Sequence, residues 1–190
     1  MNQHSVENKH FKNENFTKNI LPKAEYLDCS FANCNFENSD ISNNIFLECE
    51  FVECNFSNVN VTNTTFNEVE FYNCKLVGVL FQNCNDFLLG FNFKDCMLNL
   101  SSFYKLKISA TKFLNCKMHN VEFSESVAKN TSFLDCDLKG STFRNTNLEN
   151  ADFLTAYNFV IDPSDNQIKN AVFSKENCLG LLIAFNIRIK

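Results

Sequence analysis

Ten cysteines are the residues of this 190-residue sequence with the most obvious chemistry. Several stand in repeated pairs, such as Cys29 with Cys34 and Cys49 with Cys54, and cysteine thiolates are common zinc ligands. The members of each pair are five residues apart, whereas a structural zinc site uses the shorter Cys-x-x-Cys hook. Free cysteine otherwise packs as a compact hydrophobic residue. The spacing therefore favours a structural role in the core, with ten free thiols and no bound metal ion.

The histidines and glycines form no catalytic pattern. The three histidines, His4, His10 and His119, are far apart in the sequence. None belongs to a recognisable Cys/His or Ser/His/Asp arrangement. The chain has only four glycines, too few to build a phosphate-binding loop. We therefore expect a protein that is not an enzyme and that uses no cofactor.

The sequence repeats with a period of five residues. Apolar centres recur at every fifth position from Phe11 to Phe81 and, after a slip of two positions, from Phe93 to Phe153. All 28 centres are apolar, and they include 17 of the 22 phenylalanines. This period matches neither an α-helix nor a β-strand. It indicates a chain that turns a corner every five residues and points one large centre and one small residue, two positions earlier, inward.

The pattern small–x–Leu/Phe–x–x resembles the pentapeptide-repeat family over residues 11–153. In that family four pentapeptides form one square coil, and the 20-residue spacing of Cys34, Cys54 and Cys74 agrees with such a coil. The resemblance implies an all-β protein, a right-handed quadrilateral β-helix in a single domain, residues 1–190. About seven coils at the spacing of neighbouring strands give a rod about 34 Å long. Turn-forming residues two positions after the centres are the expected corners: Asn33, Asn38, Asn43, Asn58, Asn63, Asn73, Gly78, Asn115, Asn120, Asn130, Gly140 and Asn145.

Residues 82–92 interrupt the repeat, because they contain two residues more than the period allows. Phe87, Leu88 and Leu89 form an apolar run there, which is unusual in a surface loop. One interpretation is a bulge that keeps part of itself in the core. The other is a small protruding patch that contacts a partner.

Residues 154–190 depart from the repeat and are expected to form a C-terminal cap. A turn begins at Pro163, and Ser174 has the position of a helix N-cap. The apolar residues that follow predict a short α-helix and a strand-like end: Cys178, Leu181, Leu182, Phe185, Ile187 and Ile189. This apolar face must be buried. It either plugs the last coil or pairs with its copy in a two-fold dimer.

The charges are unevenly distributed along the sequence. The net charge of −5 argues against direct binding of nucleic acid. Residues 24–74 contain nine Asp or Glu and no Lys or Arg, whereas residues 75–145 carry a net charge of +3. On a 20-residue coil, six of the acids cluster near one corner: Asp28, Glu48, Glu50, Glu53, Glu68 and Glu70. They form either a solvated face or a surface that imitates DNA phosphates for a basic partner.

The C-terminal tail also resembles the endings of the Qnr-type, MfpA-type and McbG-type members of the family. The similar residues are the paired leucines, the final Ile-x-Ile and the segment Ile161-Asp162-Pro163. In those proteins the tail forms a dimer, and the acidic rod binds DNA gyrase. The resemblance therefore implies a homodimeric DNA mimic that binds a type II topoisomerase, either DNA gyrase or topoisomerase IV. Such a protein would give quinolone resistance or toxin self-immunity.

A second class of function is a structural or regulatory scaffold that binds an unrelated protein partner, since a fold does not determine a function. Both functions suit a cytoplasmic protein. We expect that location because the sequence contains neither an apolar stretch long enough to span a membrane nor a signal peptide.

Overall fold

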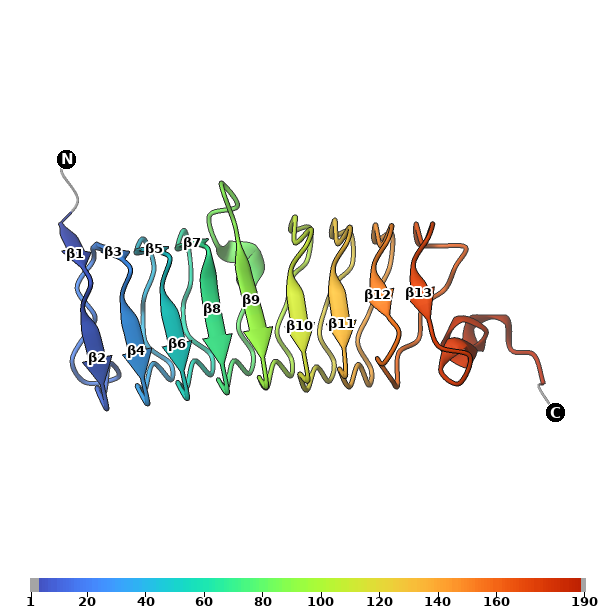
Figure 1. Cartoon of the computed structure of the whole chain (residues 1–190), viewed down its shortest axis with the longest axis horizontal. Helices are drawn as coiled ribbons and strands as arrows, with labels where there is room; N and C mark the ends of the chain where they lie inside the picture. Colours follow the sequence, from blue (N-terminus) through green and yellow to red (C-terminus); the bar gives the residue numbers. More distant parts are fainter. Residues whose placement is uncertain (1–3, 189–190) are drawn as a thin grey trace.

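The computed structural model describes residues 4–188. They form a rod of stacked coils, and a short helical segment closes its C-terminal end (Figure 1). The strands are β1 (Ser5–Glu7), β2 (His10–Lys12), β3 (Glu25–Leu27), β4 (Ser30–Ala32), β5 (Ile45–Leu47), β6 (Glu50–Val52), β7 (Thr65–Asn67), β8 (Val69–Tyr72), β9 (Phe91–Lys94), β10 (Lys112–Leu114), β11 (Ser132–Leu134), β12 (Asp152–Phe153) and β13 (Val172–Phe173). Three short 3-10 helices accompany them: η1 (Phe81–Asn83), η2 (Cys178–Leu181) and η3 (Ile183–Phe185).

The strands pair in parallel, and each coil lies directly on the previous one. One sheet has four strands in the order β1-β3-β5-β7, and the other has nine in the order β13-β12-β11-β10-β9-β8-β6-β4-β2. Partner residues are 20 positions apart, as in Phe31 with Phe51, except at the insertion, where Phe71 pairs with Phe93. The remaining sides carry isolated parallel bridges. The expected all-β fold, a right-handed four-sided β-helix, is confirmed.

The ladder continues beyond the last centre of the five-residue pattern. Phe173 in β13 pairs with Phe153 in β12, so one more coil follows the repeats. Its inward positions are filled irregularly by Phe159, Ile161 and Asn166, all of which are buried. Nine stacked strands make about eight coil steps, or about 38 Å of rod, where the sequence period indicated about seven.

Left-handed backbone conformations form the corners. All the expected corner residues have positive φ, from 51° at Asn145 to 72° at Gly140. Asparagine tolerates this conformation because its short side chain can hydrogen-bond locally, and glycine tolerates it because it has no Cβ. The corner side chains also bond along the rod: Asn33 Nδ2 donates to Asn13 Oδ1 at 2.7 Å. The corners therefore set the five-residue period.

Stacked phenylalanine rings fill the core beneath the nine-stranded sheet. Neighbouring rings have centroids 4.6 to 5.3 Å apart and planes within 16° of parallel. The stack consists of Phe11, Phe31, Phe51, Phe71, Phe93, Phe113, Phe133, Phe153 and Phe173. The small inward residues add hydrogen bonds between coils. Thr64 Oγ1, for example, donates to the carbonyl of Ile41 at 2.9 Å.

The insertion divides the core into two patterns. Before it, rings also stack on two further sides of the coil: Tyr26, Phe46 and Phe66 on one, and Phe16, Phe36 and Phe56 on the other. After it, rings stack on the side opposite the nine-stranded sheet: Phe81, Phe103, Phe123 and Phe143. Phe91 lies at the junction, with its ring centroid 6.4 Å from that of Phe66 and 5.4 Å from that of Phe81. One extra aromatic side chain thus absorbs the change of pattern.

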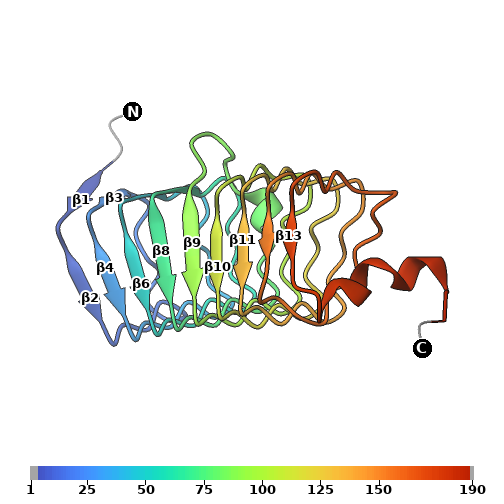
Figure 2. The same cartoon turned by 45° about the vertical axis from the view of Figure 1, so that its right-hand side comes forward.

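The C-terminal segment is helical, but it is not the α-helix that the sequence predicted. η2 and η3 are successive 3-10 turns, held by bonds such as Phe185 N to Leu182 O at 3.1 Å (Figure 2). Ser174 Oγ accepts a hydrogen bond from Asn177 N at 3.0 Å. This bond closes a turn, and the N-cap of η2 is Asn177 in place of the predicted Ser174. The spacing of the apolar residues indicated only an α-helix, because the contacts with the coil below that favour 3-10 turns cannot be read from that spacing.

Gly180 docks this segment on the end of the rod. Its carbonyl accepts a hydrogen bond from Ile161 N at 3.2 Å. A Cβ at this position would collide with the carbonyl oxygen of Phe159. The segment therefore covers the last coil at close range, as a cap must in a solenoid whose coils bury only each other.

The ring stack generates a test of the core. Phe113→Ala removes a fully buried ring from the middle of the stack and should lower the free energy of unfolding by about 3–5 kcal/mol. The matched control is Phe87→Ala, whose ring is 71% exposed and whose loss should change stability by less than about 0.5 kcal/mol. Urea unfolding followed by circular dichroism measures both. Similar losses in the two variants would contradict the assignment of the stack as the core.

Candidate protein-binding surface

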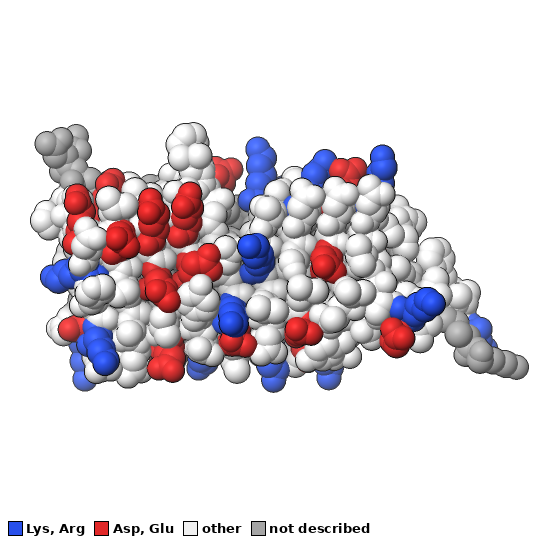
Figure 3. Space-filling model, in the orientation of Figure 1, with Lys and Arg blue, Asp and Glu red and all other residues white. Residues whose placement is uncertain are grey.

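The six acids near one corner, here called the acidic corner, consist of Asp28, Glu48, Glu50, Glu53, Glu68 and Glu70. Three of them, Asp28, Glu48 and Glu68, directly follow β3, β5 and β7, and the register of these strands places them in one column. All three are exposed and have φ between 49° and 53°. Figure 3 shows acidic side chains gathered over this N-terminal half of the rod.

Stability of the fold does not explain these three carboxylates. A glutamate in the left-handed conformation costs about 1 kcal/mol or more compared with glycine, and like charges on neighbouring strands repel each other. Most other corners use asparagine, which bonds along the column, as Asn63 does with Asn43 at 2.9 Å. The column of Asp28, Glu48 and Glu68 replaces such bonds with repulsion. Its residue types therefore point to a role outside the fold.

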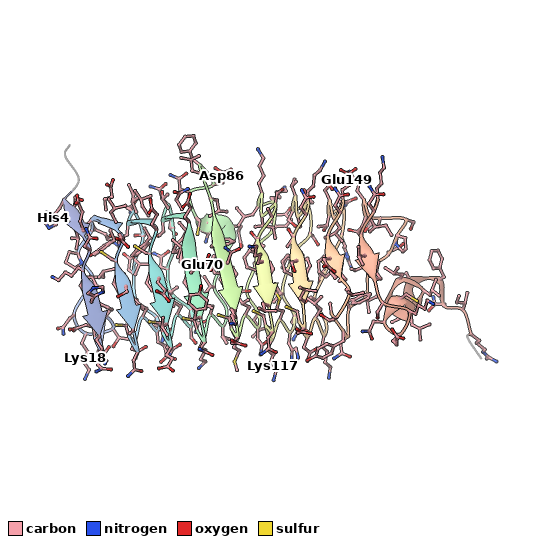
Figure 4. The ribbon with its side chains drawn as sticks, in the orientation of Figure 1. His4, Lys18, Glu70, Asp86, Lys117 and Glu149 are labelled. Carbon is pink, nitrogen blue, oxygen red and sulfur yellow. The ribbon has the colours of Figure 1, made fainter. Side chains whose placement is uncertain are left out.

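Glu50 and Glu70 continue the acidic corner onto the nine-stranded sheet. They are register partners on β6 and β8. Glu50 is exposed, whereas Glu70, labelled in Figure 4, is half-buried. Glu70 accepts a hydrogen bond from Asn92 Nδ2 at 2.7 Å. Glu53, at the far end of β6, lies at the next corner, so the structure brings five of the six acids together and places this one across the sheet. None of the six forms an ion pair with another residue of 4–188.

The insertion projects from the edge of the rod beside the acidic corner, between β8 and β9 (Figure 1). Leu88 also has positive φ, 56°, but it lies in the loop, because the register of β8 with β9 places Gly90 next to Glu68. The loop is fixed at its base, because Asn67 Nδ2 donates to Leu88 O at 2.7 Å and Gly90 N donates to Phe66 O at 2.9 Å. An apolar loop thus ends the acidic column.

Both interpretations of the insertion describe part of it. Leu89 packs against the core and Phe91 is buried. Phe87 and Leu88 are 71% and 65% exposed. Of the three loop residues predicted to contact a partner, these two are available on the surface, and Leu89 serves mainly to hold the loop on the rod.

The C-terminal tail, like the insertion, contains both residues that are partly buried and residues that are exposed. The predicted dimerisation residues Cys178, Leu181 and Leu182 are half-buried, and Leu181 packs against the core. Phe185 and Ile187 are exposed, and Ile189 lies outside the described residues. Two further apolar residues, Leu179 and Ile183, are also about half exposed. They lie off the face that an α-helical spacing of the other apolar residues predicts.

The cysteines lie in the core as expected. All ten are free, nine are buried, and Cys178 is half-buried. Their thiols bond to backbone, as Cys49 Sγ does to Tyr26 O at 3.3 Å. Burial raises the pKa of Cys49 to about 12 and that of Cys34 to about 11, which favours the unreactive thiol. Among residues 4–188, no three Cys, His, Asp or Glu side chains gather as they would around a metal ion.

The sequence pattern did not indicate a pairing of His119 with Asp137. His119 Nε2 lies 2.6 Å from Asp137 Oδ2, and Asn158 Nδ2 donates to the same carboxylate at 2.8 Å. Burial alone would raise the pKa of Asp137, but these two hydrogen bonds outweigh it, so the pKa is lowered. The two residues are 18 positions apart, almost one coil, so sorting the sequence by coil position would have brought them together.

The comparisons with known proteins agree with this geometry. A sequence model described as "pentapeptide repeat region" matches residues 24–85 and 74–153. Curated proteins give no match. A trypsin-treated form of QnrB1, a plasmid-mediated fluoroquinolone resistance protein, superposes with a TM-score of 0.60 at 15% identity, covering 98% of this chain and 92% of that one.

A second solved structure is similar to the same extent. HetL, a pentapeptide repeat protein involved in heterocyst differentiation regulation in the cyanobacterium Nostoc, has a TM-score of 0.57 at 12% identity, covering 90% of this chain and 87% of that one. At these identities both likenesses establish the fold alone. Within residues 4–188, every helix is too short to cross a lipid bilayer.

The His119–Asp137 pair generates a pH-dependent test. A carboxyl group with a lowered folded-state pKa stabilises the protein above its unfolded pKa of about 3.9, and this contribution disappears as the pH falls through the folded-state value. Asp137→Asn should therefore lose roughly 1–2 kcal/mol of stability at pH 7 and much less near pH 3. Urea unfolding at the two pH values measures this, with Asp135→Asn as the control. An equal loss at both pH values would contradict the role of the carboxylate.

Proposed function

The chain belongs to the pentapeptide-repeat family, and from that premise we propose that it is a non-catalytic DNA mimic that binds a type II topoisomerase. Its acidic corner would dock on the basic groove in which DNA gyrase or topoisomerase IV holds duplex DNA. Binding there would give resistance to quinolones or immunity to a toxin that acts on the same enzyme. The protein would work in the cytoplasm, where these enzymes act.

The observation that carries this proposal is the acidic column at positions where the fold prefers asparagine. Residues 24–74 hold nine carboxylates and no basic residue, within about 12 Å of rod length. Duplex DNA carries about seven phosphate charges over the same length. A rigid rod with this charge density can replace DNA on a basic surface, and its association should be fast and sensitive to salt.

The proposal also assigns roles to the exposed apolar residues of the insertion and of the C-terminal segment. Phe87 and Leu88 would contact the topoisomerase beside the acidic corner. The exposed apolar side of the C-terminal segment would pair with that of a second chain. Such a pairing would join two rods end to end about a two-fold axis.

An alternative is a scaffold or regulatory protein with a different protein partner. It is favoured by the likeness to HetL, which is as strong as the likeness to QnrB1. In that case the acidic corner would still be the binding surface, but its partner would be another basic protein.

The proposal predicts the effect of charge reversal on topoisomerase inhibition. The chain should inhibit the supercoiling of relaxed plasmid by gyrase from its host, or relieve inhibition by a fluoroquinolone, at micromolar concentration. Changing Glu48, Glu50 and Glu68 to Lys should weaken this effect at least about tenfold, because three attractive contacts become repulsive. Changing Glu122, Asp135 and Asp152 to Lys alters the net charge equally on the C-terminal half and should have little effect.

Equal inhibition by both triple variants would exclude the acidic corner as the binding surface. Circular dichroism must show that each variant keeps its fold. If the unchanged protein has no effect on gyrase or topoisomerase IV in either assay, the scaffold alternative replaces the proposal.

The proposed dimer has its own test. Phe185→Glu places a charge on the exposed apolar side of η3, where Phe185 is 52% exposed and its loss should not affect the coil. Light scattering at low micromolar concentration should give a dimer for the unchanged protein and a monomer for this variant. A monomer in both cases, or a dimer in both, would contradict dimerisation through the tail.

A further inference from the structure

The outer face of the nine-stranded sheet carries two parallel rows of side chains. In each strand the middle residue points into the core, and the residues on either side of it point out. The register aligns the first row as Ser30, Glu50, Glu70, Asn92, Lys112 and Ser132 on β4, β6, β8, β9, β10 and β11. It aligns the second row as Ala32, Val52, Tyr72, Lys94, Leu114 and Leu134. The first row is polar and the second mainly apolar.

The sign of the charge reverses between β8 and β9. Glu50 and Glu70 lie on one side of this line, and Lys94 and Lys112 lie on the other; Figure 3 shows the acidic region giving way to basic side chains here. Neither lysine forms an ion pair with a residue of 4–188. A shallow depression of about 280 Å³ crosses the line and is lined by Glu70, Tyr72, Lys94 and Lys112, among others.

We infer that this face binds the same face of a second copy of the chain, with the two rods antiparallel. The two-fold axis would run parallel to the strands, between β8 and β9. Rotation about that axis sets β8 against β9 of the partner subunit, β6 against β10, and β4 against β11. Each row then faces its own counterpart, in reversed order.

This arrangement sets residues of compatible type opposite each other along both rows. Glu50 faces Lys112 of the partner subunit, and Tyr72 faces Lys94 of the partner subunit, where an ammonium group can lie over the ring. Val52 faces Leu114 of the partner subunit. Because the interface is two-fold symmetric, each contact occurs twice. A shift by one strand would set Glu70 against Lys112 of the partner subunit, but it would also set Lys94 against its own copy. The alignment about the line between β8 and β9 brings opposite charges together without opposing like charges.

The insertion is compatible with the pairing. It leaves the rod at the edge of the sheet in both views, so it does not cover the face (Figures 1 and 2). It also lies between β8 and β9, where the axis passes. The two loops would therefore project from the same edge of the dimer beside the axis, each with the exposed side chains of Phe87 and Leu88.

The pairing rests on register and charge, and it does not depend on the proposed function. The pairing nevertheless affects the proposed function, because it covers Glu50 and Glu70 and would compete with a basic partner. The six paired strands span only about 29 Å. The interface is therefore at the small end of the range for protein complexes, and we expect association in the range of tens to hundreds of micromolar.

Charge exchange tests this geometry directly. Sedimentation equilibrium is measured in the Phe185→Glu background, which removes the proposed contact between tails. Glu50→Lys and Lys112→Glu should each weaken self-association at least about tenfold, because each creates two repulsive contacts per dimer. An equimolar mixture of the two variants should associate as strongly as the parent, since both contacts between unlike copies are attractive. The double variant should also recover.

The matched controls are Glu122→Lys and Arg144→Glu, which alter charge equally on the opposite side of the coil. Neither control variant should associate more weakly than the parent. A mixture of the two should associate no more strongly than either one alone. If self-association recovers in the mixture while Glu50→Lys leaves gyrase inhibition unchanged, the pairing is supported and the proposed function is not. The two proposals can therefore fail separately. The inference is overturned if the parent remains monomeric at millimolar concentration, or if the mixture associates no better than its components.

Discussion

The in-register stacking of square coils is the constraint from which the other features follow. Outside the insertion, each residue of a coil lies above the residue 20 positions earlier, so any side-chain type that recurs at that interval becomes a continuous column. A column of phenylalanines becomes the stacked core. A column of carboxylates, formed by Asp28, Glu48 and Glu68, becomes a line of negative charge whose spacing the backbone holds fixed. The backbone spaces successive residues of a column about 4.8 Å apart. The side chains on the surface are therefore spaced as regularly as those in the core.

The insertion is the one large departure from that regularity, and most differences between the two halves begin there. The four-stranded sheet ends at β7, and the rings move to another side of the coil beyond Phe81. The charge on the nine-stranded sheet changes sign at the same point. Phe87 and Leu88 are placed outside the rod next to the acidic corner. A local lengthening of two residues thus separates an acidic segment from a basic one and marks the boundary with an apolar loop.

Much of this could be predicted from the sequence, because the corner and the two inward residues are local features repeated in every coil. The corners, the buried cysteines and the acidic column all follow from position in the repeat. The coil at residues 154–173 could not be predicted in this way, because Phe159 and Ile161 fill it without the regular spacing. The form of η2 and η3 depends on the close approach of Gly180 to Phe159, which is a tertiary contact. The division of the insertion between a buried Leu89 and an exposed Phe87 likewise depends on the coil below.

The central claim is that the acidic corner occupies a site where another protein holds DNA. Competition measures this most directly: a fluorescently labelled chain is bound to host gyrase, and anisotropy is followed as unlabelled duplex DNA is added. The account predicts that DNA displaces the chain completely and that the affinity of the chain falls as salt is raised. A complex in which gyrase holds DNA and the chain together, with the affinity for the chain unchanged, would contradict it.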